Sequence, residues 1–298
     1  MHQVHRLLKN KNMKIQIIVG FFILSALVWL GFAINGHYHV STDDAYINAN
    51  VVRIAPRVTG KVIKLHIKNN QFVEKGQVLF DLDPEPFQVA IDAAQAQLML
   101  SEAELTNANM NEKRTLTLVQ KHYVSPQGGD DVIASYKIAL AKVEANKAAL
   151  QQANLNMRYT HVTAPTSGWV ANVSTREGDM VAANQPLFAL ISHEEFWADA
   201  NFKETEMEHI KPGQTATIVT DLYPNHTFHG YVESISGGAG AAFSLLPPQN
   251  ATGNWVKVTQ RVPVRVAITD HDPAYPLRIG ISADVTINLQ DYVKNAQP

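Results

Sequence analysis

The sequence predicts a mainly β protein that also carries a long α-helical hairpin and an N-terminal transmembrane helix. Three observations lead to this fold class: a β-rich motif written twice, at residues 52–87 and 160–192, a helix-forming stretch between the two copies, and an uncharged stretch near the N-terminus. Because neither copy can bury its apolar face alone, the two are expected to pair into one split, lipoyl-like β-sandwich. The hairpin would then project from the middle of that domain.

The predicted parts follow one another along the chain and are threaded through each other. They are a basic tail (1–14), a transmembrane anchor (15–34), a linker with the first barrel strand (35–51), the first half-sandwich (52–84), a coiled-coil hairpin (85–158), the second half-sandwich (159–192), a small β-barrel (193–291) and a tail (292–298). Several small modules are therefore expected in place of one or two ordinary domains.

The N-terminal region predicts an uncleaved membrane anchor. Residues 1–14 contain basic side chains and no acid, and residues 15–34 contain no charge. A helix of that length spans roughly 30 Å, the thickness of the hydrocarbon core of a bilayer. The basic flank favours a cytoplasmic N-terminus, which places the rest of the chain outside the cytoplasm. The alternative, a cleaved signal peptide, would have a shorter apolar core followed by a small-residue cleavage site.

The two β-rich copies coincide when one is shifted by 108 positions. Gly60 then falls on Gly168, and further anchors match: Val62 with Val170, Leu65 with Val173, Val73 with Val181, Gln77 with Gln185, Leu79 with Leu187, Phe80 with Phe188 and Leu82 with Leu190. The two glycines are expected where strands approach each other closely. The pairs at 69–70 (NN) and 177–178 (EG) are typical of turns.

The segment between the copies predicts a helical hairpin. Residues 85–122 contain no glycine, and the DPEP sequence at 83–86 is a helix-start signal. Apolar and small residues recur with a period near 3.5 in both arms, which predicts an antiparallel coiled coil. The turn is expected at 124–130, with Asp130 or Asp131 capping the second helix. The seam is rich in Ala, Ser and Asn, which favours additional helix contacts in an assembly.

The C-terminal third predicts a second β-domain. Its segments are rich in β-branched and aromatic residues and are separated by Pro-Gly, Gly-Gly and Pro-Pro breaks. Several short strands in a segment of this length predict a small barrel, with a tight turn at Pro212-Gly213. The acid pair Asp43-Asp44 is interpreted as polar residues that enter a strand, and not as a catalytic pair.

Composition excludes several classes of function. The chain has no cysteine, which rules out disulfides, thiol chemistry and cysteine-based metal sites. The formal net charge of −2 gives no support for nucleic-acid binding. Two pairs of nearby histidines, His37 with His39 and His226 with His229, lack a third ligand at a recognisable spacing. Neither a metal nor another cofactor is therefore expected.

The repeated halves resemble the lipoyl or biotinyl carrier domain. Carrier domains present a modified lysine in the tight turn between their halves, and here the insertion 88–158 replaces that turn. The resemblance therefore implies the fold without the cofactor site. A swinging-arm carrier within an enzyme complex is the alternative from a different functional class.

Three local motifs and the order of the modules point to a family. The motifs are TDDAY at 42–46, ANFKET at 200–205 and AAFSLLPPQNATGNW at 241–255. The combination resembles the HlyD-type periplasmic adaptors, or membrane fusion proteins, and the motifs are similar to those of the EmrA-type subgroup. One departure is the hairpin, which is much shorter than is usual in that subgroup and closer to the aromatic-acid-efflux adaptors.

The resemblance implies a non-enzymatic adaptor in the bacterial inner membrane, with its N-terminus in the cytoplasm and most of the chain in the periplasm. Such an adaptor links an inner-membrane pump, for the EmrA type a major-facilitator drug/proton antiporter, to a TolC-like outer-membrane channel for export of drugs or other small toxic compounds. Several copies assemble, here expected as a trimer or hexamer. The alternatives within transport are an adaptor of an ABC-type secretion system and one of an aromatic-acid efflux pump.

Two sets of candidate site residues complete the expectations. The family docks its hairpin tip on the channel through an Arg-x3-Leu-x6-Ser pattern, which Arg114, Leu118 and Ser125 match. The competing interpretation places Leu118 in the helical seam and leaves Arg114 as a solvated charge. The second set belongs to an apolar loop, expected to contact a neighbouring copy or to line the conduit. Its members are Phe243, Ser244, Leu245, Leu246, Asn250 and Trp255.

Overall fold

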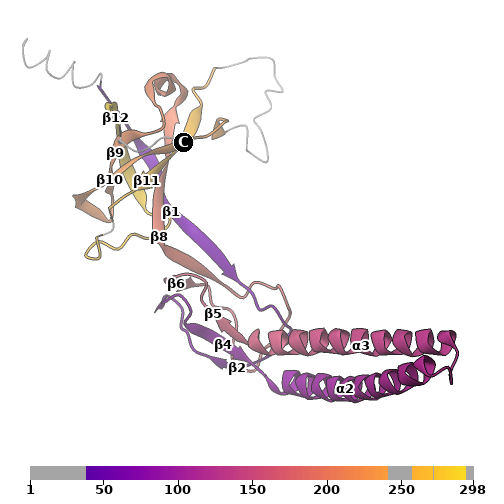
Figure 1. Ribbon diagram of the computed structural model, residues 1–298. Helices are drawn as coiled ribbons and strands as arrows, with labels where there is room; N and C mark the ends of the chain where they lie inside the picture. The colour runs from indigo at the N-terminus through magenta and orange to yellow at the C-terminus, as the bar shows by residue number, and fades with distance from the viewer. Residues whose placement is uncertain (1–37, 241–256, 271, 293–298) are drawn as a thin grey trace, which may run out of the picture. The chain divides into compact units, whose positions relative to one another are not determined.

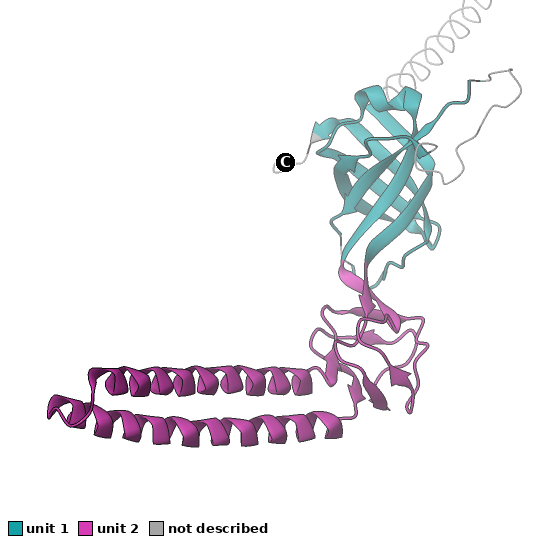
Figure 2. Ribbon diagram, turned by 90° about the vertical axis from the view of Figure 1, so that its right-hand side faces the viewer, with its two compact units in different colours: residues 1–50, 195–298 teal, residues 51–194 magenta. Residues whose placement is uncertain are grey.

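The computed structural model describes residues 38–240, 257–270 and 272–292 (Figure 1). The predicted anchor at 15–34 lies outside these ranges. Within them, no helix is both long and apolar enough to cross a membrane. The chain divides into two compact units (Figure 2), which we call the barrel unit, residues 1–50 with 195–298, and the hairpin unit, residues 51–194.

The β part of the hairpin unit is built from both sequence copies. One small sheet has the strand order β5-β4-β2-β7. In the other sheet, β6 pairs with β8 and β3 pairs with β6. The strands are β2 (Gly60–Leu65), β3 (Phe72–Val73), β4 (Val78–Leu82), β5 (His161–Thr163), β6 (Gly168–Ala171), β7 (Met180–Val181), and the unit's share of β1 (His39–Ile54) and β8 (Phe188–Lys203). Equivalent residues of the two copies, such as Leu82 and Leu190, fill one common core. The two halves thus bury their apolar faces against each other.

The sequence offset of 108 reappears as reciprocal hydrogen bonds between the copies. The backbone N–H of Asn70 donates to the carbonyl of Val170, and the N–H of Gly178 donates to the carbonyl of Val62, both at 2.8 Å. The donors, Asn70 and Gly178, are 108 positions apart, and so are the acceptors, Val62 and Val170. The repeat is therefore a pseudo-two-fold relation in which each half completes the other.

Backbone conformation follows the same relation. Asn70 (φ 63°) corresponds to Gly178 (φ 97°), and Gly76 (φ 84°) corresponds to Asn184 (φ 62°). Glycine and asparagine are the residues that adopt left-handed backbone at least cost, so each copy carries one of each at its two sharp turns. The turns predicted at 69–70 and 177–178 are confirmed.

The two equivalent glycines do not play equivalent roles. A Cβ atom at Gly168 would lie 2.0 Å from the carbonyl oxygen of Ile191 on the neighbouring strand β8. A Cβ atom at Gly60 would meet only the side chain of Leu82, at an ordinary 3.4 Å. Close strand approach therefore explains Gly168, and the same expectation for Gly60 is wrong because its neighbour there is a side chain and not a backbone.

Two helices, α2 (Glu85–Gln120) and α3 (Pro126–Arg158), lie side by side in the hairpin unit (Figures 1 and 2). The Lys142 ammonium lies 2.6 Å from the Glu104 carboxylate and joins the helices across their middle. Their buried and half-buried positions follow the heptad spacing of the sequence and include Phe87, Ile91, Ala94, Leu98, Ser101, Leu105, Ala108 and Thr115 of α2 and Val132, Tyr136, Ala139, Val143, Asn146, Leu150, Ala153 and Met157 of α3.

The barrel unit is a closed six-stranded barrel. Its strands follow the order β1-β12-β9-β10-β11-β8, and β1 also pairs with β8. Beyond β1 and β8 they are β9 (Gln214–Thr220), β10 (Tyr223–Ile235), β11 (Arg261–Ile268) and β12 (Ser282–Tyr292), and the short 3-10 helix η1 (Glu204–His209) precedes β9. Strand β9 alternates buried and half-buried residues along its whole length, as a strand with one face in a core must. The tight turn at Pro212-Gly213 is confirmed.

Side chains from separate motifs of the sequence meet on the barrel. One oxygen of Asp44 accepts a hydrogen bond from the Asn201 side chain (3.2 Å), and the other lies 2.8 Å from Nη1 of Arg261. The hydroxyl of Thr42 donates to the carbonyl of Asn201 (2.9 Å). The acid pair near the N-terminus thus has a structural role at Asp44, where it joins β1, β8 and β11.

Candidate functional site

The hairpin tip is a tight connection between α2 and α3. The N–H of His122 donates to the carbonyl of Val119 and the N–H of Tyr123 donates to the carbonyl of Leu118, both at 2.9 Å. With His122 at a φ of 61°, these two bonds form a Schellman motif, which satisfies the last carbonyls of α2. Histidine holds the left-handed position that glycine usually occupies.

The second helix begins earlier than its sequence suggests. The hydroxyl of Ser125 accepts a hydrogen bond from the N–H of Gly128 (3.3 Å), and Pro126 occupies the first turn. Ser125 is therefore the N-cap of α3, and the cap expected at Asp130 or Asp131 is wrong. Gly128 and Gly129 have low helix propensity and are typical of loops. A serine cap followed by proline is a strong helix start, and it outweighs the low propensity of the glycines.

The face that contains Arg114 and Leu118 points away from the partner helix. Both side chains are exposed, Leu118 by 41%, and they lie one turn apart on α2. Among the described residues, Arg114 forms no ion pair. Tyr123, which the pattern does not include, is 77% exposed in the connection that follows α2. The tip therefore presents a cation and two apolar side chains to solvent.

Packing inside the tip explains why Leu118 faces outward. The seam is filled by Leu116 and Val119, whose side-chain carbons lie 3.6 and 3.3 Å from the position that a Cβ would take at Gly129. Gly129 is buried and lets the two helices approach closely. The structure thus brings Arg114 and Leu118 to one surface, gives Ser125 a capping role, and rules out the seam position for Leu118.

At the other end of the hairpin, one carboxylate joins β4, β5 and the residue that follows β2. Asp81 on β4 has His66 Nε2 2.6 Å from one oxygen and His161 Nδ1 2.6 Å from the other. Partial burial of Asp81 opposes its ionisation, but the hydrogen bonds and charges of the two imidazoles outweigh it and lower the pKa of the carboxyl group. Strand β4 leads into α2 and β5 follows α3, so this cluster braces the base of the hairpin.

A second set of heptad positions lies on the outer faces of both helices. The residue two positions after each seam residue lies on the opposite side of the helix. These positions, which we call the outer rows, are Val89, Ala93, Ala96, Leu100, Ala103, Asn107 and Met110 on α2 and Ala134, Ile138, Ala141, Ala145, Ala148, Gln152 and Leu155 on α3. All are exposed except Leu155, which is half-buried.

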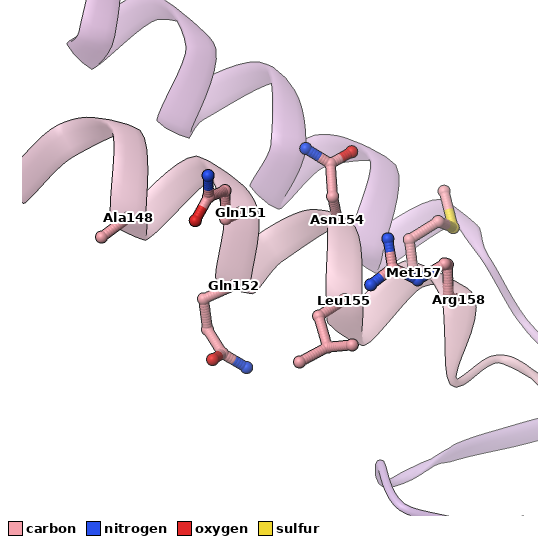
Figure 3. Close-up of a pocket in the computed structure, with 7 residues that line it drawn as sticks. All are labelled: Ala148, Gln151, Gln152, Asn154, Leu155, Met157 and Arg158. Atoms are coloured by element: carbon pink, nitrogen blue, oxygen red, sulfur yellow. The ribbon is translucent and has the colours of Figure 1, made fainter. Parts of the chain in front are cut away.

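Part of the α3 row borders a hollow of about 780 Å³. In Figure 3, Ala148, Gln152 and Leu155 project from the side of α3 that is turned away from α2. Ile138, in the same row, is 69% exposed. Small and apolar side chains in heptad spacing are typical of a surface that packs against another helix.

The described ranges contain no group of three His, Asp or Glu side chains placed to hold a metal ion. His226 instead stacks on Tyr275, with ring centroids 4.0 Å apart. The second candidate set, Phe243, Ser244, Leu245, Leu246, Asn250 and Trp255, lies outside the described residues.

Comparison with known protein families divides the chain as the two units do. Residues 50–193 match the family described as "RND MFP, barrel-sandwich hybrid domain", and residues 195–288 match the "AAEA-like beta-barrel domain". The first match covers nearly all of the hairpin unit, and the second covers most of the C-terminal part of the barrel unit. The lipoyl-like halves thus belong to an adaptor and not to a cofactor carrier.

Individual proteins agree with these matches. The chain is 36% identical to the fatty acid resistance protein FarA of Neisseria gonorrhoeae, over 83% of this chain and 75% of the relative. It is 34% identical to the multidrug export protein EmrA of Escherichia coli K12, over 83% of this chain and 76% of the relative. Among solved structures, the membrane fusion protein Spr0693 from Streptococcus pneumoniae R6 shares the fold, with a TM-score of 0.61 and 16% identity over 84% of this chain and 97% of that one.

Proteins of this kind are non-enzymatic adaptors of efflux pumps. They are anchored at the inner membrane, extend into the periplasm, oligomerise, and work with inner-membrane transporters and outer-membrane channels. Residue identities, both domain matches and the fold agree on this assignment. The chain therefore belongs to the membrane fusion protein family of periplasmic adaptors, in its EmrA-like multidrug-export subgroup.

Proposed function

We propose that this chain links an inner-membrane drug/proton antiporter of the major-facilitator type to a TolC-like outer-membrane channel for export of drugs or other small toxic compounds. The observation that carries the proposal is the exposed face of Arg114 and Leu118 at the free end of the helix pair. The similarity to a multidrug export protein supports the substrate class. A single transmembrane helix at 15–34 is part of the proposal and anchors the adaptor beside its pump.

The tip has the chemistry of a docking surface. An unpaired guanidinium one turn from an exposed leucine can bury area and form a charge-assisted hydrogen bond in one contact. The helices are roughly 50 Å long, which carries this contact well away from the β part of the unit. Ser125 supports the surface indirectly, because its cap fixes where α3 begins.

Crosslinking at position 118 tests the docking partner. A photoreactive amino acid replaces Leu118 in cells, and the adducts are identified by mass spectrometry. We expect a TolC-like outer-membrane protein as the main adduct. Adducts only to other copies of the chain or to the inner-membrane pump would contradict docking by the tip. The same substitution at exposed Lys68, in the β part of the unit, is the control and should give no channel adduct.

Self-association into trimers or hexamers is the second part of the proposal. The outer rows supply apolar contact, and the helices differ in charge. Residues 85–112 of α2 carry acids but no Lys or Arg, whereas residues 132–158 of α3 carry Lys137, Lys142, Lys147 and Arg158 but only one acid. We infer that α2 of one copy packs on α3 of the next, as Glu104 and Lys142 already pair within one copy. The apolar loop at 237–254 is proposed as a further contact with a neighbouring copy or as a lining of the conduit.

Ile138 offers a direct test of this interface. Replacing Ile138 with Glu removes an apolar contact and places an acid against the acidic α2 of the neighbour, so we expect the assembly to dissociate to protomers in native mass spectrometry. Ile138→Lys removes the same contact but keeps the charge complementary, and should retain more of the assembly. An oligomer distribution of Ile138→Glu equal to that of the wild type would contradict packing through the outer rows.

An adaptor of an aromatic-acid pump or of an ABC-type exporter is the second candidate. The observation that favours it is the short hairpin, with helices of 36 and 33 residues. The identity of the transporter decides between the candidates. Purification of the intact complex through this chain should recover a major-facilitator antiporter under the first proposal and a different transporter under the second.

A further inference from the structure

Three arginines border one hollow at the base of the hairpin. Arg53 and Arg57 come from the end of β1 and the segment after it, and Arg158 is the last residue of α3. The hollow has a volume of about 430 Å³ and lies within the hairpin unit. Tyr159 and His161 complete its polar rim. Residues about 100 positions apart in sequence thus converge on a basic site.

The positive charge of this hollow is not balanced locally. No Asp or Glu lines it. None of the three arginines forms an ion pair with a described residue, although Arg261 pairs with Asp44 and Arg265 lies near Asp199 on the barrel. Asp81, the hydrogen-bond partner of His161, does not line the hollow, and its oxygens are occupied by His66 and His161. The guanidinium groups are therefore available to an anion.

Part of the hollow is held in place before any ligand arrives. The guanidinium carbon of Arg57 lies 4.9 Å from the centre of the Tyr159 ring, a cation–π contact that restricts its motion. His161 is fixed by its hydrogen bond to Asp81. A binding group that is ordered in advance loses less conformational entropy when it binds.

The helix dipole accounts for only one of the three arginines. Arg158 ends α3, where a cation interacts favourably with the helix dipole. Arg53 and Arg57 lie outside any helix, so the dipole does not explain them. A solvated arginine alone would need no explanation, but three around one hollow without a carboxylate form a site.

We propose that this hollow binds an amphipathic organic anion. Guanidinium groups match carboxylate and phosphate oxygens in bidentate geometry, so Arg53, Arg57 and Arg158 would hold the oxyanion. The hollow along α3 in Figure 3 is also bordered by Arg158, and it continues past Leu155. The apolar part of the ligand lies beside Leu155 and Met157 at the end of α3, next to Arg158, and leaves the rest of the outer row to the neighbouring copy. The inference goes beyond adaptor docking and does not depend on which channel or pump is engaged.

The ligand is tested with 4-phenylbutyrate, a soluble amphipathic anion. Isothermal titration calorimetry uses the full chain in nanodiscs of neutral phosphatidylcholine. We expect binding of 4-phenylbutyrate that weakens with added salt, and much weaker binding of acetate and of the neutral 4-phenylbutanol. Equal affinity for 4-phenylbutanol would overturn the anionic site, and equal affinity for acetate would overturn the amphipathic one. No binding of 4-phenylbutyrate at millimolar concentration would overturn the proposal altogether.

Variants locate the site on the chain. Changing Arg53, Arg57 and Arg158 together to Gln should weaken 4-phenylbutyrate at least about tenfold, the effect of losing charge-assisted hydrogen bonds. Arg57→Lys keeps the charge but loses the planar fork and should give an intermediate loss. Arg176→Gln removes an exposed arginine of the same unit outside the hollow and should change nothing. Wild-type affinity in the triple variant, with unchanged circular dichroism, would overturn the assignment.

The source of the anion is distinguished in the same assay. In nanodiscs that contain phosphatidylglycerol, a lipid headgroup in the hollow would compete with the probe, so the apparent affinity for 4-phenylbutyrate would fall. Unchanged affinity would assign the hollow to a soluble organic anion. Reduced and unchanged affinity both support the site. Together with the variants, they identify the ligand as a lipid headgroup or as a soluble organic anion.

Discussion

Reversing the chemistry of the hairpin tip with Arg114→Glu and Leu118→Asp is expected to abolish efflux while protein levels stay unchanged. Both side chains are exposed and do not support the helix seam, so the helices should fold with the new residues. The two changes remove a cation and an apolar anchor from a contact in which few residues supply most of the binding energy. Drug tolerance of a deletion strain that carries the variant, measured beside an immunoblot, checks the result.

A shifted pair of substitutions is the matched control. Lys113→Glu with Thr117→Asp makes the same charge reversal and adds the same acid at the same spacing, one residue earlier on α2. Both positions are exposed but lie on a neighbouring face. This control should retain efflux. Equal loss in both double variants would assign the effect to net charge, and full tolerance in the Arg114 and Leu118 variant would reject docking through this face.

Gly168→Ala is expected to destabilise the hairpin unit strongly. The new methyl group would overlap the carbonyl oxygen of Ile191, which cannot move unless the ladder between β6 and β8 shifts. Overpacking against backbone of this kind costs about 3 kcal/mol of unfolding free energy. Denaturant unfolding of the full chain, followed by tryptophan fluorescence, measures the change, because Trp169 is adjacent to the site.

The equivalent substitution in the other copy is the control. Gly60→Ala places its methyl group at an ordinary contact distance from the Leu82 side chain. We expect a loss below about 1 kcal/mol, since a side chain can adjust where a backbone cannot. Similar losses at Gly60 and Gly168 would show that the glycines serve backbone freedom and not close strand approach.

The repeat and the heptads were readable from sequence because both are periodic. The offset of 108 predicted which residues share a core, and the two-fold hydrogen bonds follow from it. The start of α3 was missed because Gly128 and Gly129 favour a loop on propensity, while the capping bond of Ser125 decides the structure. Leu118 could not be assigned to a face, because its outward direction depends on how Leu116 and Val119 fill the seam at the tip.

The hollow lined by three arginines could not be predicted from the sequence. Arg53, Arg57 and Arg158 have no common spacing, and they converge only because β4 pairs with β5 and returns the end of α3 to the β part of the unit. Tyr123 carried no signal either, since its exposure follows from the Schellman turn. Contacts of this kind depend on tertiary structure and not on local preference.

The pairing of β4 with β5 has a consequence for how such proteins diversify. These strands hold the two roots of the hairpin in register, with Asp81 opposite His161, whatever lies beyond them. Whole heptads can then be gained or lost in both arms together while the seam and the β fold remain intact. The alignment with the Escherichia coli relative spans 296 positions but covers only 83% of this chain, so that protein carries residues without a counterpart here. The length of the hairpin can therefore change, in evolution or by design, without a change in the β fold that holds its base.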